Sequence, residues 1–307
     1  MQQVFNAELR PVDENGIRFG IASGDIQYVT NKDDTAVASV QERDLWLYEK
    51  DTNELLQVFS FANQEGSDER SRNDQHAVRI ISLEDDGSMA FAVYGYMNRG
   101  THEGEVGVGI YYFDIDSNAI EEKAFIPSTK SFAIAEDELG KMVYYNHGQE
   151  MLYVLADGTL YQINLENDEQ NVLAEDLEEG QYAVSDDGHL MAYQTNGSLY
   201  TSTEIKVMNL TTGDENTIQA SGSDGIRPLG FVNGDFIYGK INPDDAGTTA
   251  SGEEITPMYE LEIRNADNET EASYSFTDNN IYTTGILVEG NMVTLNRVRK
   301  NGSTYQS

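Results

Sequence analysis

The residues whose types could do chemistry are densest between residues 94 and 112, in the stretch YGYMNRGTHEGEVGVGIYY. A ligand pocket needs aromatic walls and a few well-placed polar groups, and this stretch contains both. We therefore predict that it forms part of a ligand- or partner-binding site, through Tyr94, Tyr96, Arg99, His102 and Glu103. The alternative is an ordinary hairpin loop, in which Arg99 pairs with Glu103 or Glu105.

A second group of candidate binding residues precedes this stretch and consists of Arg70, Arg72 and His76. The chain has 19 Lys and Arg against 54 Asp and Glu, so Arg70, Arg72 and Arg99 form a local excess of positive charge. These arginines could hold an anion, or they could neutralise nearby carboxylates. Of the four histidines, His76 and His102 are the two that we expect could meet in space.

Several common catalytic and metal-binding motifs are absent from the sequence. There is no HExxH zinc motif and no GxSxG nucleophile elbow. The absence of cysteine excludes disulfides, thiolate metal sites and cysteine nucleophiles. DIDSN (114–118) begins like a calcium loop, but Ala119 stands where that loop needs glycine, so we interpret it as a turn. We therefore predict no catalytic residue, no cofactor and no metal site.

The elements that must position these residues form a repeat. A glycine followed by alternating apolar and aromatic residues recurs every 46 to 63 residues, at Gly24, Gly87, Gly140, Gly188, Gly234 and Gly290. Each of the first five copies is followed by a strand, a short turn rich in Asp, Asn, Gly and Thr, and another strand. An apolar strand precedes most of the glycines. The repeating unit is therefore four strands, A to D, and only residues 134–141 suggest a helical turn.

Four-stranded repeats of this length are typical of a β-propeller. We predict an all-β chain, a β-propeller of four-stranded antiparallel blades, with six blades and with five or seven as alternatives. Two packed β-sandwiches are the competing architecture. The whole chain, 1–307, is expected to be one domain, in which residues 1–10 supply the missing outer strand of the last blade. The predicted blades are 17–61, 77–127, 131–175, 181–220, 226–276 and 281–307.

In such a fold the B–C loops and the D–A links lie on one face, and the A–B and C–D turns lie on the other. The long polar segments are predicted B–C loops, at 32–43, 97–107, 195–203 and 242–257, and a D–A link, at 62–76. Loops displayed by a rigid scaffold commonly carry binding sites, so we predict that this face is the binding face. Trp46 is predicted to be buried between blades one and two.

SDDGHLMAY (185–193) and IKVMNLTTGDENTI (205–218) resemble the repeat of TolB-like (WD40-like) propellers, with Asp186 where that repeat has proline. VYGYMNRGTHEGEVGVGIYYF, SDDGHLMAYQTNG and EGNMVTLNRV resemble an uncharacterised family of membrane-anchored proteins from anaerobic Gram-positive bacteria. The second resemblance implies an extracytoplasmic, envelope-associated protein, and it brings no known activity. The cysteine-free sequence also suits an exported protein.

The composition narrows the class of partner. The net charge of −35 argues against nucleic acid and against an anionic membrane surface. No apolar run has membrane-spanning length, so a membrane would be reached only through a segment outside this chain, which we expect to be a piece of a longer protein. We predict a monomeric, non-catalytic binding propeller with a protein, peptide or glycan partner. The alternatives are a propeller enzyme that acts on glycans through paired carboxylates and a ligand-free structural spacer.

Overall fold

The computed structural model describes residues 7–11, 18–23, 44–49, 54–60, 76–84, 86–97 and 100–306. The chain divides into two compact units. The first unit comprises residues 1–157 and 161–171, and the second comprises residues 158–160 and 172–307. No helix among the described residues has the length and apolar character needed to cross a membrane.

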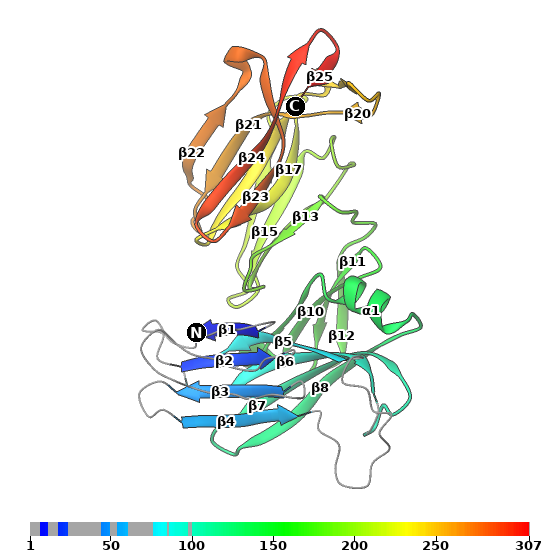
Figure 1. The fold of residues 1–307 in the computed structure, drawn as a ribbon, viewed down its shortest axis with the longest axis vertical. Helices are drawn as coiled ribbons and strands as arrows, with labels where there is room; N and C mark the ends of the chain where they lie inside the picture. Colours follow the sequence, from blue (N-terminus) through cyan, green and yellow to red (C-terminus); the bar gives the residue numbers. More distant parts are fainter. Residues whose placement is uncertain are drawn as a thin grey trace, which may run out of the picture. The chain divides into compact units, whose positions relative to one another are not determined.

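The first unit contains three four-stranded sheets, apart from residues 159–160 and 172–174 of the third, and in each sheet every strand is hydrogen-bonded to the next along the chain (Figure 1). We call each sheet of this kind a blade. Blade one consists of β1 (Ala7–Pro11), β2 (Arg18–Ser23), β3 (Asp44–Glu49) and β4 (Glu54–Ser60). Blade two consists of β5 (His76–Leu83), β6 (Met89–Tyr96), β7 (Val106–Asp114) and β8 (Ala119–Ser128). Blade three, which follows α1 (Phe132–Leu139), consists of β9 (Val143–Asn146), β10 (Met151–Ala156), β11 (Thr159–Asn164) and β12 (Glu169–Ala174).

The second unit continues the same pattern. Blade four consists of β13 (Tyr182–Val184), β14 (Leu190–Gln194), β15 (Glu204–Asn209) and β16 (Glu215–Gln219). Blade five consists of β17 (Gly225–Val232), β18 (Asp235–Ile241), β21 (Met258–Arg264) and β22 (Thr270–Ser275), which are not a separate sheet but part of a nine-stranded one. In that sheet Met258 of β21 also pairs with Thr283 of the strand that follows blade five. The last strands are β23 (Ile281–Glu289), β24 (Met292–Asn301) and β25 (Thr304–Gln306). The predicted fold class, all-β with four-stranded antiparallel blades, is confirmed, while the number of blades and the closure of a ring stay predictions.

The burial of the strands follows from their places in the blades. The second strand of blade two, MAFAVYGY, is buried along almost its whole length, because both of its faces meet protein. One of these faces contributes Phe91 and Val93 to an apolar cluster with Leu45 and Leu47 of blade one. The outer strand β8 begins with exposed residues, because it has a neighbour on one side only.

The glycine repeat marks the first turn of most blades, as predicted. Gly87, Gly188, Gly234 and Gly290 all have positive φ and lie between the first and second strands that they were expected to join. The copy at Gly140 is different. The strand that follows it, β9, is the edge strand of blade three and pairs with β10, so it is strand A and not strand B. The residues before Gly140 form α1, which leaves no preceding strand, and the suggestion of a helical turn at 134–141 is confirmed.

The N-terminal segment is also placed differently from the prediction. β1 pairs antiparallel with β2, from Ala7 opposite Ser23 to Pro11 opposite Phe19, so it is the first strand of blade one. The outer-strand role that we predicted for residues 1–10 in the last blade is therefore corrected. Pairing with the next strand along the chain closes only a short loop, which costs little conformational entropy. Trp46 lies in β3, but its side chain is outside the described set, and its burial stays a prediction.

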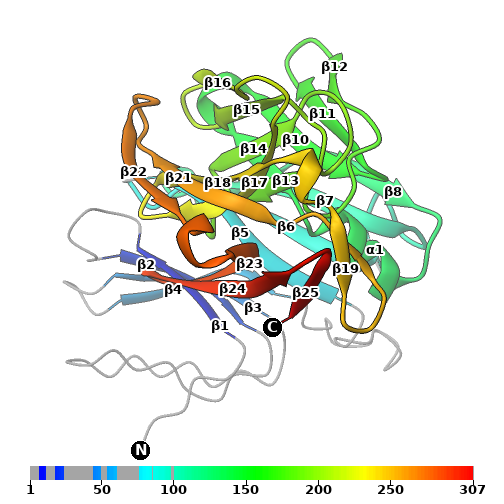
Figure 2. The same cartoon turned by 90° about the horizontal axis from the view of Figure 1, so that it is seen from above.

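The predicted B–C loop 242–257 does lie between the second and third strands of blade five, but it forms its own hairpin. β19 (Gly247–Thr249) pairs with β20 (Glu254–Ile255), and it also pairs in parallel with β25 (Figure 2). A Cβ at Gly247 would lie 2.4 Å from Ser303 O, so this close approach requires glycine. The loop is fastened by Asp245, whose carboxylate pairs with Lys300 (2.5 Å) and accepts a hydrogen bond from Tyr282 (3.2 Å).

Candidate binding site

Four of the eight predicted binding residues lie outside the described residues, wholly or through their side chains. Arg70, Arg72 and Arg99 lie outside the described residues, and so does the side chain of His76, whose backbone begins β5. The proposed meeting of His76 and His102 and the pairing of Arg99 with Glu103 or Glu105 therefore stay predictions.

His102 lies in the loop between β6 and β7 and is fixed against the outer strand of blade two. Its ring stacks on Phe125 with the centroids 3.9 Å apart, and its Nε2 lies 2.9 Å from Glu122 Oε1. Its Nδ1 lies 3.6 Å from Glu105 Oε2, and Tyr111 donates a hydrogen bond to the other oxygen of Glu122. These contacts account for His102 as an anchor of the loop.

The two tyrosines of β6 point to the same face of the strand but differ in exposure. Tyr94 is 2% exposed, with the Arg79 guanidinium 5.6 Å from the centre of its ring, and is a core residue. Tyr96 is 39% exposed and lies at the end of the strand, next to the loop. Glu103 is exposed as well. Of the described candidates, Tyr96 and Glu103 are therefore the two most available to a partner, and their role in binding stays a prediction.

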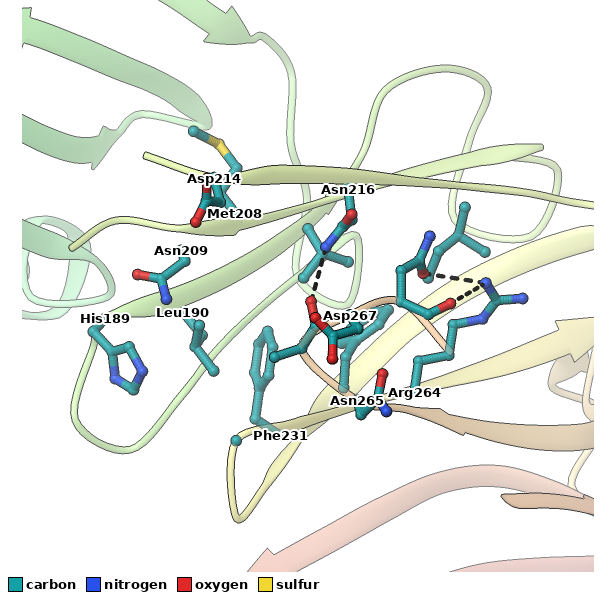
Figure 3. Close-up of a pocket in the computed structure, with 16 residues that line it drawn as sticks. His189, Leu190, Met208, Asn209, Asp214, Asn216, Phe231, Arg264, Asn265 and Asp267 are labelled. Carbon is teal, nitrogen blue, oxygen red and sulfur yellow. Dashed lines mark hydrogen bonds between the residues drawn. The ribbon is translucent and has the colours of Figure 1, made fainter. Parts of the chain in front are cut away.

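The second unit contains a cavity of about 300 Å³ between blades four and five (Figure 3). Its lining comes from the A–B and C–D turns of the two blades and from the strands beside them. The cavity therefore lies at the opposite end of these blades from their B–C loops, 195–203 and 242–257. The lining residues are His189, Leu190, Val207, Met208, Asn209, Asp214, Asn216, Ile218, Phe231, Gly234, Phe236, Arg264, Asn265, Ala266, Asp267 and Asn268.

One wall of the cavity is apolar. Phe231 and Phe236, which flank the turn between β17 and β18, have their ring centroids 5.2 Å apart. They belong to the same apolar cluster as Ile218 of blade four, and Leu190 and Val207 pack against it. The cluster fixes the aromatic rings in place, so the cavity has a preformed flat surface.

The arginine of the cavity is already neutralised. Arg264 Nη2 lies 2.8 Å from Glu262 Oε1, and Nη1 donates to the backbone and side-chain oxygens of Asn268 (Figure 3). Glu262 is 5% exposed and also pairs with Lys240 at 2.7 Å. Burial alone would raise the pKa of Glu262, but hydrogen bonds from Lys240, Thr270 and Tyr238 outweigh it and lower this pKa to about 2.

The histidine of the cavity is also paired. His189 Nδ1 lies 2.6 Å from Asp187 Oδ1, and Ser185 Oγ donates to the same oxygen. Burial opposes ionisation of Asp187, but the hydrogen bonds from His189 and Ser185 hold its pKa well below the ordinary range. Ser, Asp and His thus meet, but the hydroxyl donates to the carboxylate and not to the imidazole. This is not the order of a nucleophilic triad, in which histidine lies between the other two.

Several polar groups of the cavity retain hydrogen-bonding capacity. The Asn209 side-chain oxygen accepts from the amides of Thr211 and Thr212, which leaves its NH₂ group. Asn216 donates to Ala266 O, which leaves its side-chain oxygen (Figure 3). The Asp267 carboxylate has no hydrogen-bond or ion-pair partner among the described residues. Donors and acceptors thus line the cavity beside the apolar wall.

At the corresponding place between blades two and three, within the first unit, two aromatic rings are in contact. Tyr112 lies two residues before Asp114 at the end of β7, as Val207 lies two residues before Asn209 at the end of β15. The Tyr112 ring stacks on His147 of blade three with the centroids 3.8 Å apart. Asp114 and Asn209 both accept backbone amides of their turns, which supports the equivalence. The small side chain of Val207 therefore helps to open the cavity.

Sequence reasoning missed this cavity because both turns that form it are short. The signal that could have found it is the substitution of Val207 for the aromatic residue at the equivalent position in blade two. A second signal is the number of asparagines in and beside the two C–D turns, Asn209, Asn216, Asn265 and Asn268. Both signals compare equivalent positions of different blades, so they can be recognised only after the strands of the blades have been matched to one another.

The blades define the class, an all-β protein of four-stranded antiparallel sheets, and solved propellers are among the structures that it resembles. TolB from Acinetobacter baumannii is 13% identical, with a TM-score of 0.35, over 79% of this chain and 52% of that one. The β-propeller domain of the trilobed protease from Pyrococcus furiosus is 12% identical, with a TM-score of 0.41, over 95% and 75% of the two chains. An oligogalacturonate lyase in complex with manganese is 12% identical, with a TM-score of 0.35, over 68% and 46%.

The chain thus spans about half the length of TolB and of the lyase. No family model matches it, and no curated protein matches it.

Proposed function

We propose that this chain is a non-catalytic binding domain of TolB-like propeller type, and that the cavity between blades four and five is its ligand site. The observation that supports this proposal is the lining of the cavity, with a rigid aromatic wall beside unsatisfied amide and carboxylate groups. Small-molecule sites commonly occupy about 300–1,000 Å³ and combine apolar walls with a few polar groups. At about 300 Å³ the cavity has room for a small ligand or for the end of a larger one.

The carboxyl groups with a resolved pKa shift all favour the ionised form. A glycan-cleaving enzyme needs one carboxyl group with a raised pKa near a second carboxylate. Among the described residues, every carboxyl group with a resolved shift has a lowered pKa, because hydrogen bonds and neighbouring cations outweigh burial; these are Asp114, Glu150, Asp187, Glu204 and Glu262. Such groups are ionised at neutral pH and cannot serve as general acids there.

Two further parts of the proposal concern the setting of the domain. We place it outside the cytoplasm, in a cell-envelope protein, on the resemblance of its repeat and on its cysteine-free sequence. The exposed Tyr96 and Glu103 support a second contact surface on the B–C loop side of blade two. A protein, peptide or glycan partner suits either surface.

The test of the cavity is to fill it. Val207→Tyr copies the side chain that closes the equivalent place in blade two, and it leaves the charge unchanged. Crystals of the wild type soaked with fragment mixtures should show density in the cavity, and crystals of V207Y should show none there. The matched control is Thr217→Tyr, at an exposed position of β16 that does not line the cavity.

Both variants should keep the wild-type circular dichroism spectrum and melting temperature. Fragments that avoid the cavity of the wild type, or that occupy it equally well in V207Y, would overturn the assignment of the ligand site.

A further inference from the structure

We infer that the ligand of this cavity is an uncharged pyranose unit of a glycan, and that acidic sugars are rejected. The inference rests on the proposed function, and it names the chemical class that the cavity selects. Three properties of the lining carry it: a flat apolar surface, hydrogen-bonding groups of both kinds, and the charge that remains after internal pairing.

The flat surface is supplied by Phe231. Phe231 is one of the residues that line the cavity (Figure 3), where 9% of it is exposed, and the tilted contact with Phe236 holds its ring in place. One face of a pyranose consists largely of C–H groups, which pack well against an aromatic ring, whereas a flexible alkyl chain gains no advantage from a flat partner.

The polar groups suit hydroxyls better than ions. A hydroxyl both donates and accepts, so a sugar edge needs both kinds of partner within reach. The Asn209 NH₂ group donates, while the Asn216 side-chain oxygen and the Asp267 carboxylate accept. Because these groups come from the C–D turns of two neighbouring blades, they can contact hydroxyls on two sides of one ring.

The residual charge excludes anions. The arginine that lines the cavity is paired, Arg264 with Glu262, and the imidazole of His189 is engaged by the Asp187 carboxylate. Asp214 and Asp267 then remain as carboxylates without an ion-pair partner among the described residues. A uronic acid would bring its carboxylate close to these two charges with no cation to compensate, and such an arrangement is strongly disfavoured.

A lysine-bearing peptide is the competing ligand, because two carboxylates that lack an ion-pair partner among the described residues attract an ammonium group. The amide donor of Asn209 and the pairing of Asp214 Oδ2 with the Thr212 hydroxyl at 2.7 Å count against it. An ammonium group cannot accept a hydrogen bond from the Asn209 amide, and the Thr212 hydroxyl already occupies one oxygen of Asp214. The peptide is therefore an outcome of the test and not part of the inference.

The experiment is isothermal titration of the whole chain with maltotriose, cellotriose, mannotriose, triacetylchitotriose, trigalacturonate and trilysine. At least one neutral trisaccharide should bind, and trigalacturonate should not. Phe231→Leu, which keeps apolar volume but removes the flat ring, and Asp267→Ala should each weaken that binding about tenfold or more. Asp116→Ala, an exposed carboxylate in the β7–β8 turn of the first unit, is the matched control and should leave binding unchanged.

The outcomes separate this inference from the proposed function. Binding of trilysine that is lost in V207Y, with no binding of neutral sugars, would overturn the glycan class and keep the cavity as the ligand site. Binding of a neutral trisaccharide that V207Y leaves unchanged would overturn both. Binding of trigalacturonate as strong as that of the neutral sugars, or no binding of any probe, would overturn the inference alone, and the soaked crystals would then decide the proposed function.

Discussion

Glu262 illustrates how a single buried carboxylate connects the cavity with the stability of its blade. It is held by Lys240 and Arg264, and Arg264 in turn fixes the C–D turn through Asn268. Burial of a carboxylate costs free energy, and its ion pairs with two cations offset that cost. The balance stays favourable only while both partners remain in place. The side chains that shape one wall of the cavity therefore depend on Glu262 being ionised.

This dependence predicts a response to acid. The pKa of Glu262 is lowered from 4.5 to about 2 in the folded state, so its contribution to stability is fully present above about pH 4.5. It is lost as the pH falls from there toward 2, because the unfolded chain takes up the proton first. Urea unfolding of the wild type and of Glu262→Gln between pH 6 and pH 2.5 should show their difference shrinking with acid. A difference independent of pH would contradict the paired role of Glu262.

The two tyrosines of β6 make a matched pair for a second prediction. Tyr94→Ala should lower the free energy of unfolding by about 3 kcal/mol or more, because it empties a core position. Tyr96→Ala should change it by less than about 0.5 kcal/mol, because the side chain is exposed. Urea denaturation measures both. A large loss in Y96A would make Tyr96 a structural residue and remove it from the proposed loop-side surface.

At the scale of elements, the hairpin β19–β20 shows how an apparent loop becomes part of a sheet. The parallel pairing of β19 with β25 requires the backbones to come as close as they do at Gly247, where a Cβ would meet Ser303 O at 2.4 Å. Gly247→Ala should therefore detach β19 or shift it, at a cost of about 1–3 kcal/mol. Hydrogen exchange should then speed up in β19 and β25 and stay unchanged in blade four.

The control for this variant is Gly148→Ala, where a Cβ would meet only the Asn146 side-chain oxygen, at 3.6 Å. This glycine lies in the 3₁₀ turn His147–Gln149 of the first unit. Unchanged exchange in β25 of G247A would show that the parallel pair tolerates the added methyl group and does not depend on the close approach.

The strands and turns inside a typical blade could be predicted from the sequence, whereas the departures from the repeat, at β9 and β19, could not. Gly188 and Gly234 have positive φ, and apolar and polar residues alternate on both sides of each turn. Local sequence was therefore enough to locate these turns. Gly140 has a similar local pattern, but a helix precedes it, and only the pairing partners of β9 reveal its place. β19 has three residues and no alternation, so nothing local marks it as a strand.

The candidate site was harder to predict than the fold, for a physical reason. Long loops can be recognised in a sequence, whereas a cavity between two short turns depends on the size of side chains that come together from different blades. Val207 became informative only when the strands were compared, because it has in β15 the position that Tyr112 has in β7. The loop-side residues were chosen for their types, and the structure shows His102 engaged with Phe125 and Glu122.

The charge of the whole molecule leads to a further prediction. A net charge of −35 makes the folded state repel itself, and dissolved salt screens that repulsion. The melting temperature should therefore rise when sodium chloride is increased from about 10 mM to about 500 mM, over which the screening length falls several-fold. Differential scanning calorimetry measures this directly. A melting temperature that falls with salt would mean that attractive ion pairs outweigh the general repulsion.

The parallel contact between β19 and β25 also bears on solubility. A strand at the border of a sheet offers a row of unsatisfied amides and carbonyls, which invites self-association into fibrils. Here β19 covers the edge of β25, and β20 becomes the edge strand of the sheet. β20 has only two residues, one of them Glu254, so it is too short and too charged to pair readily with another chain. The hairpin inserted in blade five thereby shields the C-terminal strand from aggregation.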